Sequence, residues 1–386
     1  MAGREAARDR RRDAGGPPQE PREGPRAGPG AGAELRGVGA ADGAAPEPDA
    51  LAGRLARWCA AQWGRAPDEV RVHGLRRLAG GSSRETWSFD LELAGALLPL
   101  VLRRDPPGRT GAGESDRGLE FRVVKAAFEA GVPAPRPHFA CADPAVLGTP
   151  FYLMDRVEGE ALPRRLLRDD RYAGAREKLL PQLAEAALRI HRVPPELPAL
   201  AGLPAPPPGV SPALAELERV SEGIRALAAE PHPVLALAER WLRARLPAPE
   251  RLALVHGDFR VGNVLFDEGG LRAVLDWELC KLGDPVEDLG WLCTRAWRFG
   301  RDDLPAGGLG TREALLAAYR DAGGGDVDPA HLRFWEAMGS YKVALVFIQQ
   351  SWVYRSGRLP SLELASLGRR TAEAEEELVR LMEESP

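Results

Sequence analysis

The segment Leu254–Glu278, LVHGDFRVGNVLFDEGGLRAVLDWE, decides the fold because it places polar residues between short apolar runs. Asn263 follows Asp258 by five positions, and Asp276 comes after a further apolar run. The residues between Asn263 and Asp276 are typical of a β-hairpin, with a glycine-rich turn at Glu268–Gly270. Such a hairpin returns Asp276 to the neighbourhood of Asn263. The sequence therefore predicts that these three polar side chains meet at one place.

A carboxylate and two oxygen-bearing side chains in this pattern fit phosphoryl transfer. That reaction needs a carboxylate to accept the proton of the attacking hydroxyl and hard oxygen ligands for Mg²⁺. Protein kinases use the same five-residue spacing between their catalytic Asp and a metal-binding Asn. We expect Asp258 to be the catalytic base and Asn263 and Asp276 to hold Mg²⁺. One such residue alone is more often a turn or cap residue, and His256 is expected to be structural.

Composition excludes several classes of protein. The 386 residues, 44% of them hydrophobic, suffice for one two-lobed unit or two domains. A formal charge of -4 gives no reason to expect a nucleic-acid partner. The four cysteines are scattered, which favours a reducing cytoplasm over a disulfide framework or zinc site. No apolar run is long enough for a membrane helix, and no secretory signal is recognisable. No obligate protein partner is evident.

The order of elements predicts an α+β fold. A tail at 1–47, rich in Arg, Gly, Pro and Ala, is expected to be disordered. The next part, 48–156, is expected to form an N-lobe, and 157–386 a helical C-lobe that carries the catalytic loop. Predicted strands lie at 70–78, 85–93, 97–103 and within 135–159, and predicted helices at 49–63, 119–130, 172–193, 212–228, 234–246 and from 285 onward. No fused second catalytic domain is expected.

The segment GDPVEDLGWL is predicted to start a helix. Asp284, Pro285 and Glu287 fit a capping box with proline at the first helical position. Asp288 is expected to support the catalytic loop. Glu278, just upstream, either reaches the metal ions or is simply solvated.

HGDFRVGN (256–263) with VLDWELCKLGDPVEDLGWL (274–292) resembles the aminoglycoside phosphotransferase and choline kinase-like family. The resemblance covers about 48–360 and is nearest to the phosphotransferase domains attached to some acyl-CoA dehydrogenases. It implies a bilobal protein-kinase-like fold with ATP or GTP and Mg²⁺ between the lobes. It assigns Asp258 as catalytic base and Asn263 and Asp276 as metal ligands.

The resemblance also implies nucleotide-binding residues in the N-lobe. Gly81, Ser82 and Ser83 stand where the family has a phosphate-covering loop, although a plain hairpin turn fits them equally. Arg103 stands where the family usually has the phosphate-binding Lys, and Arg104 is the neighbouring alternative.

Two further N-lobe roles follow from the resemblance. Glu120 is placed to pair with the phosphate-binding cation. Met154 to Arg156 would form the hinge that faces the base, with Phe151 or Met154 near the adenine. An ordinary buried strand is the alternative for the hinge.

The substrate side is less defined by the sequence. No dense acidic run lies beside the catalytic loop, and Trp335 and Tyr341 interleave with cations on a long predicted helix. An amphipathic core helix explains that pattern as well. Arg260, Glu278, Trp335 and Tyr341 are the candidate substrate residues. They suggest an apolar or anionic hydroxyl substrate such as a hydroxyacyl compound.

The sequence thus predicts a small-molecule O-phosphotransferase that moves the γ-phosphate of ATP or GTP to a hydroxyl. An aminoglycoside or macrolide kinase is one alternative, and would differ in substrate only. A nucleotide-binding pseudokinase is the other, favoured only by Arg103 in place of Lys.

Overall fold

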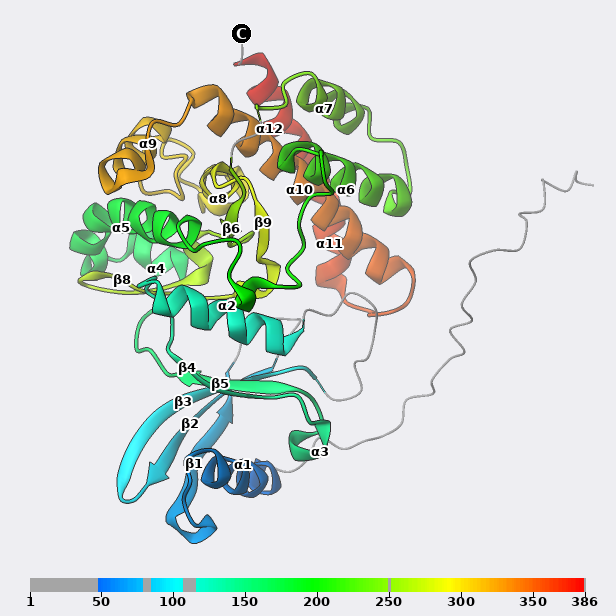
Figure 1. Cartoon of the computed structure of the whole chain (residues 1–386). Coiled ribbons are helices and arrows are strands. Elements are labelled where there is room, and N and C mark those ends of the chain that lie inside the picture. The colour runs from blue at the N-terminus through cyan, green and yellow to red at the C-terminus, as the bar shows by residue number, and fades with distance from the viewer. Residues whose placement is uncertain (1–47, 79–84, 107–115, 249–250, 385–386) are drawn as a thin grey trace, which may run out of the picture. The chain divides into compact units, whose positions relative to one another are not determined.

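The computed structural model describes residues 48–78, 85–106, 116–248 and 251–384. The predicted tail at 1–47 lies outside these residues. Residues 46–386 form one compact unit, in which a strand-rich part is followed by a helix-rich part (Figure 1). The change comes after Asp155, close to the predicted lobe boundary at 156/157. Among the described residues, no helix is long and apolar enough to cross a membrane.

The strand-rich part is a five-stranded antiparallel sheet in the order β1-β2-β3-β5-β4. Its elements are α1 (Pro48–Gln62), η1 (Pro67–Glu69), β1 (Val70–Arg77), β2 (Glu85–Leu93), β3 (Ala96–Arg104), α2 (Arg117–Glu129), β4 (Pro137–Cys141), α3 (Pro144–Leu147) and β5 (Phe151–Asp155). The predicted strands and helices all form, with ends shifted by three residues at most. The N-terminal helix starts at Pro48, and Asp49 lies in its first turn.

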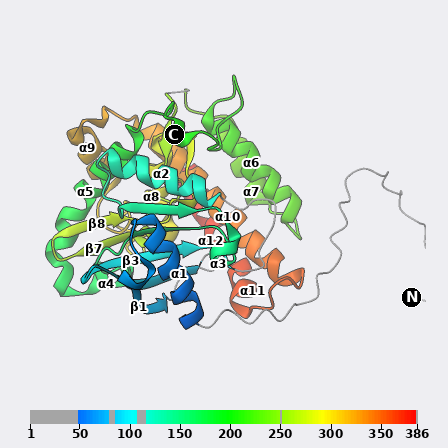
Figure 2. The ribbon, with the colours of Figure 1, turned by 60° about the horizontal axis from the view of Figure 1, so that its bottom comes forward.

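Alternation along β3 assigns its side chains to two faces of the sheet. Leu100 and Leu102 pack into the apolar cluster that α1 covers, and Val101 points to the other face. Side chains of a strand alternate between faces, so Arg103 joins Val101 on the α2 side and Arg104 joins the α1 side. Figure 2 looks onto α1 with the strands behind it, and Figure 1 shows α2 between the sheet and the C-terminal helices.

The helix-rich part surrounds two small antiparallel pairs, β6-β9 and β7-β8. Its elements are α4 (Pro163–Arg168), η2 (Asp170–Tyr172), α5 (Ala173–His191), η3 (Pro198–Leu200), α6 (Pro212–Leu227), α7 (Pro233–Arg243), β6 (Ala253–Val255), η4 (Val261–Asn263), β7 (Val264–Asp267), β8 (Gly270–Val274), η5 (Trp277–Leu279), β9 (Lys281–Gly283), α8 (Val286–Cys293), η6 (Arg295–Trp297), α9 (Arg312–Tyr319), the π-helical η7 (Arg320–Gly324), α10 (Pro329–Arg355), α11 (Leu362–Arg369) and α12 (Thr371–Glu383). The α+β class and the kinase-like, two-part arrangement are confirmed.

The centre of this part is α10, which is buried along most of its length. The contact of α10 with α8 is close because Gly290 lacks a Cβ, which would lie 2.4 Å from the Cβ of Trp335. This contact fixes α8, the helix that supports the loop between β6 and η4.

Candidate active site

The loop His256–Asn263 leaves β6 and is held at its start by the buried carboxylate of Asp288 on α8. The backbone N–H groups of His256 and Gly257 donate to the two oxygens of Asp288, at 2.8 and 2.9 Å. His191 of α5 donates from Nε2 to the same carboxylate at 3.1 Å. Burial raises the pKa of Asp288, but these hydrogen bonds and the nearby histidines more than offset it, so the pKa lies below its ordinary value. Asp288 therefore supports the loop as a charged group, in the position predicted for it.

Gly257 and His256 shape the turn into the loop. Gly257 has a φ of 79°, and a Cβ there would lie 2.3 Å from the carbonyl oxygen of Leu279, so only glycine fits. His256 is fully buried; its Nε2 donates to the Leu275 carbonyl at 3.0 Å, and its Nδ1 accepts from the Asp258 N–H at 3.3 Å. Burial lowers its pKa, which keeps the ring neutral in the Nε2–H form. His256 is thus structural, as expected.

Three donors orient the Asp258 carboxylate. Arg260 Nε and Trp291 Nε1 donate to Oδ1, at 3.0 and 2.8 Å. Asn263 Nδ2 donates to Oδ2 at 2.5 Å and to the Asp258 carbonyl oxygen at 3.0 Å. The side chain retains 18% of its accessible surface. Asp258 is therefore fixed in direction but still reachable by a substrate.

The hairpin β7-β8 brings Asp276 back beside Asn263, as the glycine turn predicts. Val264 pairs with Val274, and the Leu275 N–H donates to the Asn263 carbonyl at 2.8 Å. Asp276 adopts the left-handed conformation with a φ of 67°, which is uncommon for a residue other than glycine. Strain of this kind is often found at functional sites.

The donor set of Asn263 and Asp276 fits Mg²⁺. The amide nitrogen of Asn263 gives both of its hydrogen bonds to Asp258, so the amide oxygen is the atom of this side chain that can serve as a metal ligand. Asp276 is 41% exposed and offers carboxylate oxygen. Within the described ranges, no cluster of three or more His, Cys, Asp or Glu could hold a metal. Two oxygen ligands completed by phosphate oxygens are the usual protein environment of Mg²⁺ at a nucleotide.

Arg103 joins the two parts of the molecule at this site. Its Nη2 donates to Asp276 at 2.6 Å and lies 4.0 Å from Glu278. Its Nε lies 3.2 Å from Glu120 of α2, an ion pair without good hydrogen-bond geometry. Burial alone would raise the pKa of Asp276, but the charge and hydrogen bond of Arg103 hold it below the ordinary value. Asp276 is therefore a carboxylate at neutral pH.

Arg103, and not its neighbour Arg104, faces the hairpin. Arg104 lies on the other face of the sheet, where its Nε donates to Glu85 at 2.8 Å. Glu120 is 2% exposed in its side chain and is also bonded by Arg117 and by the Tyr152 hydroxyl, the latter at 2.8 Å. The predicted pairing of Glu120 with the strand cation is thus present, within a larger buried network.

The predicted hinge, Met154 to Arg156, is only partly suited to binding the base of a nucleotide. Met154 is buried in β5, which lies between β3 and β4. The N–H groups of Asp155 and Arg156 donate to the carbonyls of Arg136 and Pro99, so these two donors serve the sheet. The Arg156 guanidinium pairs with Asp90 at 2.9 Å. The other predicted phosphate-binding residues, Gly81, Ser82 and Ser83, lie outside the described residues.

Two of the four candidate substrate residues are core residues. Trp335 and Tyr341 are 2% and 1% exposed; the Trp335 indole donates to Asp284, and the Tyr341 hydroxyl bonds to Ser221. Both side chains are enclosed by neighbouring elements, so we do not place them in the proposed substrate site. Glu278 lies beside the candidate active site, with its Oε2 4.0 Å from the Nη2 of Arg103.

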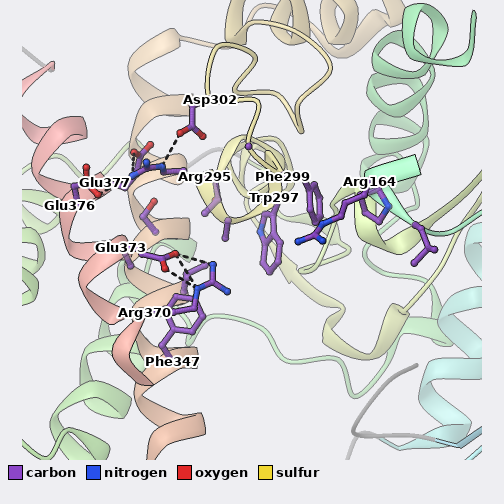
Figure 3. A pocket seen from close by; sticks show the side chains of 18 of the residues that line it. Arg164, Arg295, Trp297, Phe299, Asp302, Phe347, Arg370, Glu373, Glu376 and Glu377 are labelled. Atoms are coloured by element: carbon purple, nitrogen blue, oxygen red, sulfur yellow. Dashed lines mark hydrogen bonds and ion pairs between the residues drawn. The ribbon is translucent and has the colours of Figure 1, made fainter. Parts of the chain in front are cut away.

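A cavity of about 840 Å³ is lined in part by Trp297, which is in contact with Arg260. The Arg260 guanidinium stacks over the Trp297 ring at 4.4 Å while its Nε holds Asp258. Apolar side chains, arginines and carboxylates line the cavity together, and Figure 3 shows Arg295 and Arg370 beside carboxylates of the lining. The lining includes Arg164, Arg165, Arg168, Arg295, Trp297, Phe299, Asp302, Val343, Phe347, Arg370, Glu373, Glu376 and Glu377.

The cations of this cavity are not all neutralised. Arg295 pairs with Asp302 and Glu376, at 3.2 and 3.3 Å, as the dashed lines in Figure 3 show. Arg164 and Arg168, both on α4, have no ion-pair partner among the residues that the structure describes. This leaves positive charge at the α4 wall of the cavity.

The predicted capping box at the start of α8 does not form. Asp284 does accept from the Val286 N–H at 2.9 Å, but Glu287 turns away to Lys281, at 2.8 Å. Asp284 is instead shared with His331 and the Trp335 indole. The ion pair with Lys281 thus takes the Glu287 side chain that a capping box would use.

Trp291 is the site residue that sequence reasoning missed. It lies three positions after Asp288, on the same face of α8, so both side chains reach the catalytic loop. The i, i+3 spacing from a predicted loop-supporting Asp is the signal that was present in the sequence.

Comparisons with known proteins agree with this geometry. The family model described as phosphotransferase enzyme family (APH) matches residues 75–335. The chain belongs to this phosphotransferase family. The predicted resemblance is confirmed, and with it the prediction of a kinase-like phosphotransferase.

Curated relatives include the chicken acyl-CoA dehydrogenase family member 11, 32% identical over 289 residues, which are 70% of this chain and 35% of that protein. The chain spans about a third or less of the length of such relatives.

Among solved structures, one assigned as an aminoglycoside phosphotransferase from Ralstonia eutropha has a TM-score of 0.69 at 23% identity and covers 86% of this chain and 97% of its own. A complex of APH(2″)-IIIa with GDP and kanamycin has a TM-score of 0.57 at 16% identity, covering 82% and 97%. At these identities the likeness establishes the fold.

Proposed function

We propose that this phosphotransferase moves the γ-phosphate of ATP or GTP to a hydroxyl of a small molecule, with Asp258 as catalytic base. The observation that carries the proposal is the fixed Asp258 carboxylate, held by Arg260, Trp291 and Asn263 beside the Arg103–Asp276 pair. The GDP bound by a neighbour of the same fold supports a nucleotide at the equivalent place.

Asp258 Oδ2 accepts the proton in this proposal. Oδ1 already accepts from two donors, whereas Oδ2 accepts from Asn263 alone. The substrate oxygen forms a bond to the γ-phosphorus while the bond from that phosphorus to the β–γ bridging oxygen breaks. The hydroxyl proton passes to Oδ2. Orientation of the carboxylate favours this in-line geometry, and positioning of this kind supplies much of the rate in phosphoryl transfer.

Arg103, Asn263 and Asp276 form the phosphate end of the site. Mg²⁺, when bound through the oxygens of Asn263 and Asp276, neutralises negative charge on the β- and γ-phosphates. Arg103 is oriented by Glu120 and directs its guanidinium to the same region. Guanidinium groups bind phosphate well, so Arg in place of Lys is compatible with transfer.

The cavity beyond Arg260 is the proposed substrate site. Its apolar side chains suit an apolar body, and Arg164 and Arg168 of α4, which have no ion-pair partner among the described residues, suit an anionic group. A hydroxyacyl compound has both features. The four carboxylates of the lining are already paired with Arg295, Arg298 or Arg370. A polycationic aminoglycoside does not complement the two arginines of α4, so the charge on this wall does not favour the antibiotic-kinase alternative.

The test is Mg²⁺-dependent transfer from ATP and GTP across a hydroxyl-compound library. The library spans hydroxyacyl thioesters, aminoglycosides, macrolides, choline and sugars. We expect an anionic, partly apolar hydroxyl compound to be phosphorylated and the Asp258→Asn variant to lose at least about 10²-fold in kcat. Nucleotide binding without transfer to any compound would point to the pseudokinase alternative.

A further inference from the structure

Lys342 of α10 contacts the catalytic loop by two routes. Its Nζ donates to the Gly257 carbonyl at 3.1 Å, and it lies 4.6 Å from the centre of the Trp291 ring. Gly257 directly precedes Asp258, and the Trp291 indole donates to Asp258 Oδ1 at 2.8 Å. One ammonium group therefore holds both the peptide before Asp258 and the ring that orients its carboxylate.

Two buried carboxylates hold Lys342 in place. Glu216 of α6 and Glu287 of α8 are each 5% exposed and lie 3.9 Å from its Nζ. Both carboxylates also bond Lys281 of β9, each at 2.8 Å. Lys281 thus neutralises the same pair more closely than Lys342 does. Charge neutralisation alone does not explain the direction in which Lys342 points.

We propose that Lys342 is a positioning residue for Asp258. A charge-assisted hydrogen bond to the Gly257 carbonyl fixes the peptide plane that leads into Asp258. The cation also attracts the face of the Trp291 ring, whose N–H then points at the carboxylate. The Lys342 side chain is only 15% exposed, and both interactions are strengthened where water is largely excluded. This inference rests on the proposed function, in which Asp258 is the base.

Lys281 provides a matched control. Lys281→Met and Lys342→Met each remove one ammonium from the same two carboxylates. The side chain of Lys281 contacts those carboxylates, whereas that of Lys342 also contacts the loop. A purely structural role predicts parallel effects of the two variants, and a positioning role predicts different ones.

The first readout is steady-state kinetics on the substrate found by the library screen. We expect Lys342→Met to lower kcat about 10- to 100-fold with the nucleotide KM changed less than about threefold, since small misplacements of a catalytic group cost this much. Lys281→Met should keep kcat within about threefold while lowering the melting temperature at least as much. Equal losses of kcat in both variants would overturn the proposal.

The second readout does not depend on activity. Hydrogen exchange of peptides covering Val255–Val264 should be faster in Lys342→Met than in Lys281→Met. Unchanged exchange in Lys342→Met overturns the positioning role, even if no substrate is ever found. Absence of transfer by the wild-type protein, with the exchange difference present, contradicts the proposed function alone.

A double variant covers the case in which Lys342→Met fails to fold. Lys342→Met with Glu287→Gln removes one positive and one negative charge together, so no buried charge is left uncompensated. The same loss of kcat and the same faster exchange of the loop are expected for it. A double variant with wild-type kcat and wild-type exchange would overturn the proposal.

Discussion

Arg103 is the residue whose replacement most directly tests how the site is built. Its guanidinium joins Glu120 of α2 to Asp276 at the end of the β7-β8 hairpin. Removing one partner of a buried ion pair costs about 3–5 kcal/mol. Without Arg103, Glu120 still has Arg117 and Tyr152 as partners, so losing the Arg103–Glu120 pair should lower the free energy of unfolding by only about 2 kcal/mol. Asp276 is 41% exposed, so its pair adds only about 1 kcal/mol.

We therefore expect Arg103→Met to lower the free energy of unfolding by about 3 kcal/mol. In a double-mutant cycle with Glu120→Gln, the coupling energy should be about 2 kcal/mol. Urea denaturation followed by circular dichroism measures both quantities. Arg156→Met is the control on the same sheet, because its partner Asp90 is 37% exposed and the loss should stay below about 1 kcal/mol.

Two results would refute this reasoning. A loss below about 1 kcal/mol in Arg103→Met means that the buried pair contributes no net stability. A coupling energy near zero means that Arg103 and Glu120 act independently although their atoms lie 3.2 Å apart. Nucleotide KM in the same variants, measured in parallel, shows whether the phosphate end of the site is affected too.

Four further outcomes are expected. Gly257→Ala places a methyl group 2.3 Å from the carbonyl oxygen of Leu279, at a backbone φ of 79°. This variant should lose at least about 2 kcal/mol in its free energy of unfolding and most of its activity. A variant with a normal melting temperature would contradict the clash. The pKa of buried His256 is lowered from 6.5, so the unfolded chain binds a proton at a higher pH than the folded protein does, and the free energy of unfolding should fall as the pH drops below about 6.5. Urea denaturation at a series of pH values tests this. In the His256→Gln variant, the free energy of unfolding should depend less steeply on pH. EDTA should abolish phosphate transfer. Asn263→Ala should raise the Mg²⁺ concentration that gives half-maximal activity at least about 10-fold. An unchanged Mg²⁺ dependence in this variant would show that Asn263 is not a metal ligand. Tyr341→Phe should cost about 1 kcal/mol through its lost bond to Ser221 and leave kcat unaltered, and a large fall in kcat would return Tyr341 to the site.

The local sequence pattern was sufficient to predict the helices and strands and the three residues at the centre of the candidate active site. The five-residue spacing of Asp258 and Asn263 and the glycine turn that returns Asp276 are short-range features, and the structure brings these three residues together. Alternation along β3 also decides between Arg103 and Arg104, because side chains two apart share a face.

Packing between elements far apart in the sequence decided which predicted residues are buried and which partners they bind. Trp335 and Tyr341 have the pattern of a half-exposed helix, but neighbouring elements cover both side chains. The spacing of residues within one helix does not show which of its faces other elements cover. Glu287 was predicted to cap α8 and is bound by Lys281 instead, since a buried charge pairs with the nearest cation in space.

The sequence by itself determined the order of strands and helices, the hairpin that joins Asn263 to Asp276, and the family. These depend on periodicity, turn residues and spacing, which act over a few positions. Only the tertiary structure decided that Trp291 and Lys342 contact the catalytic loop and that arginines of α4 form one wall of the cavity near Arg260. The two hydrogen bonds join residues 33 and 85 positions apart, where geometry is set by how helices pack rather than by any local preference.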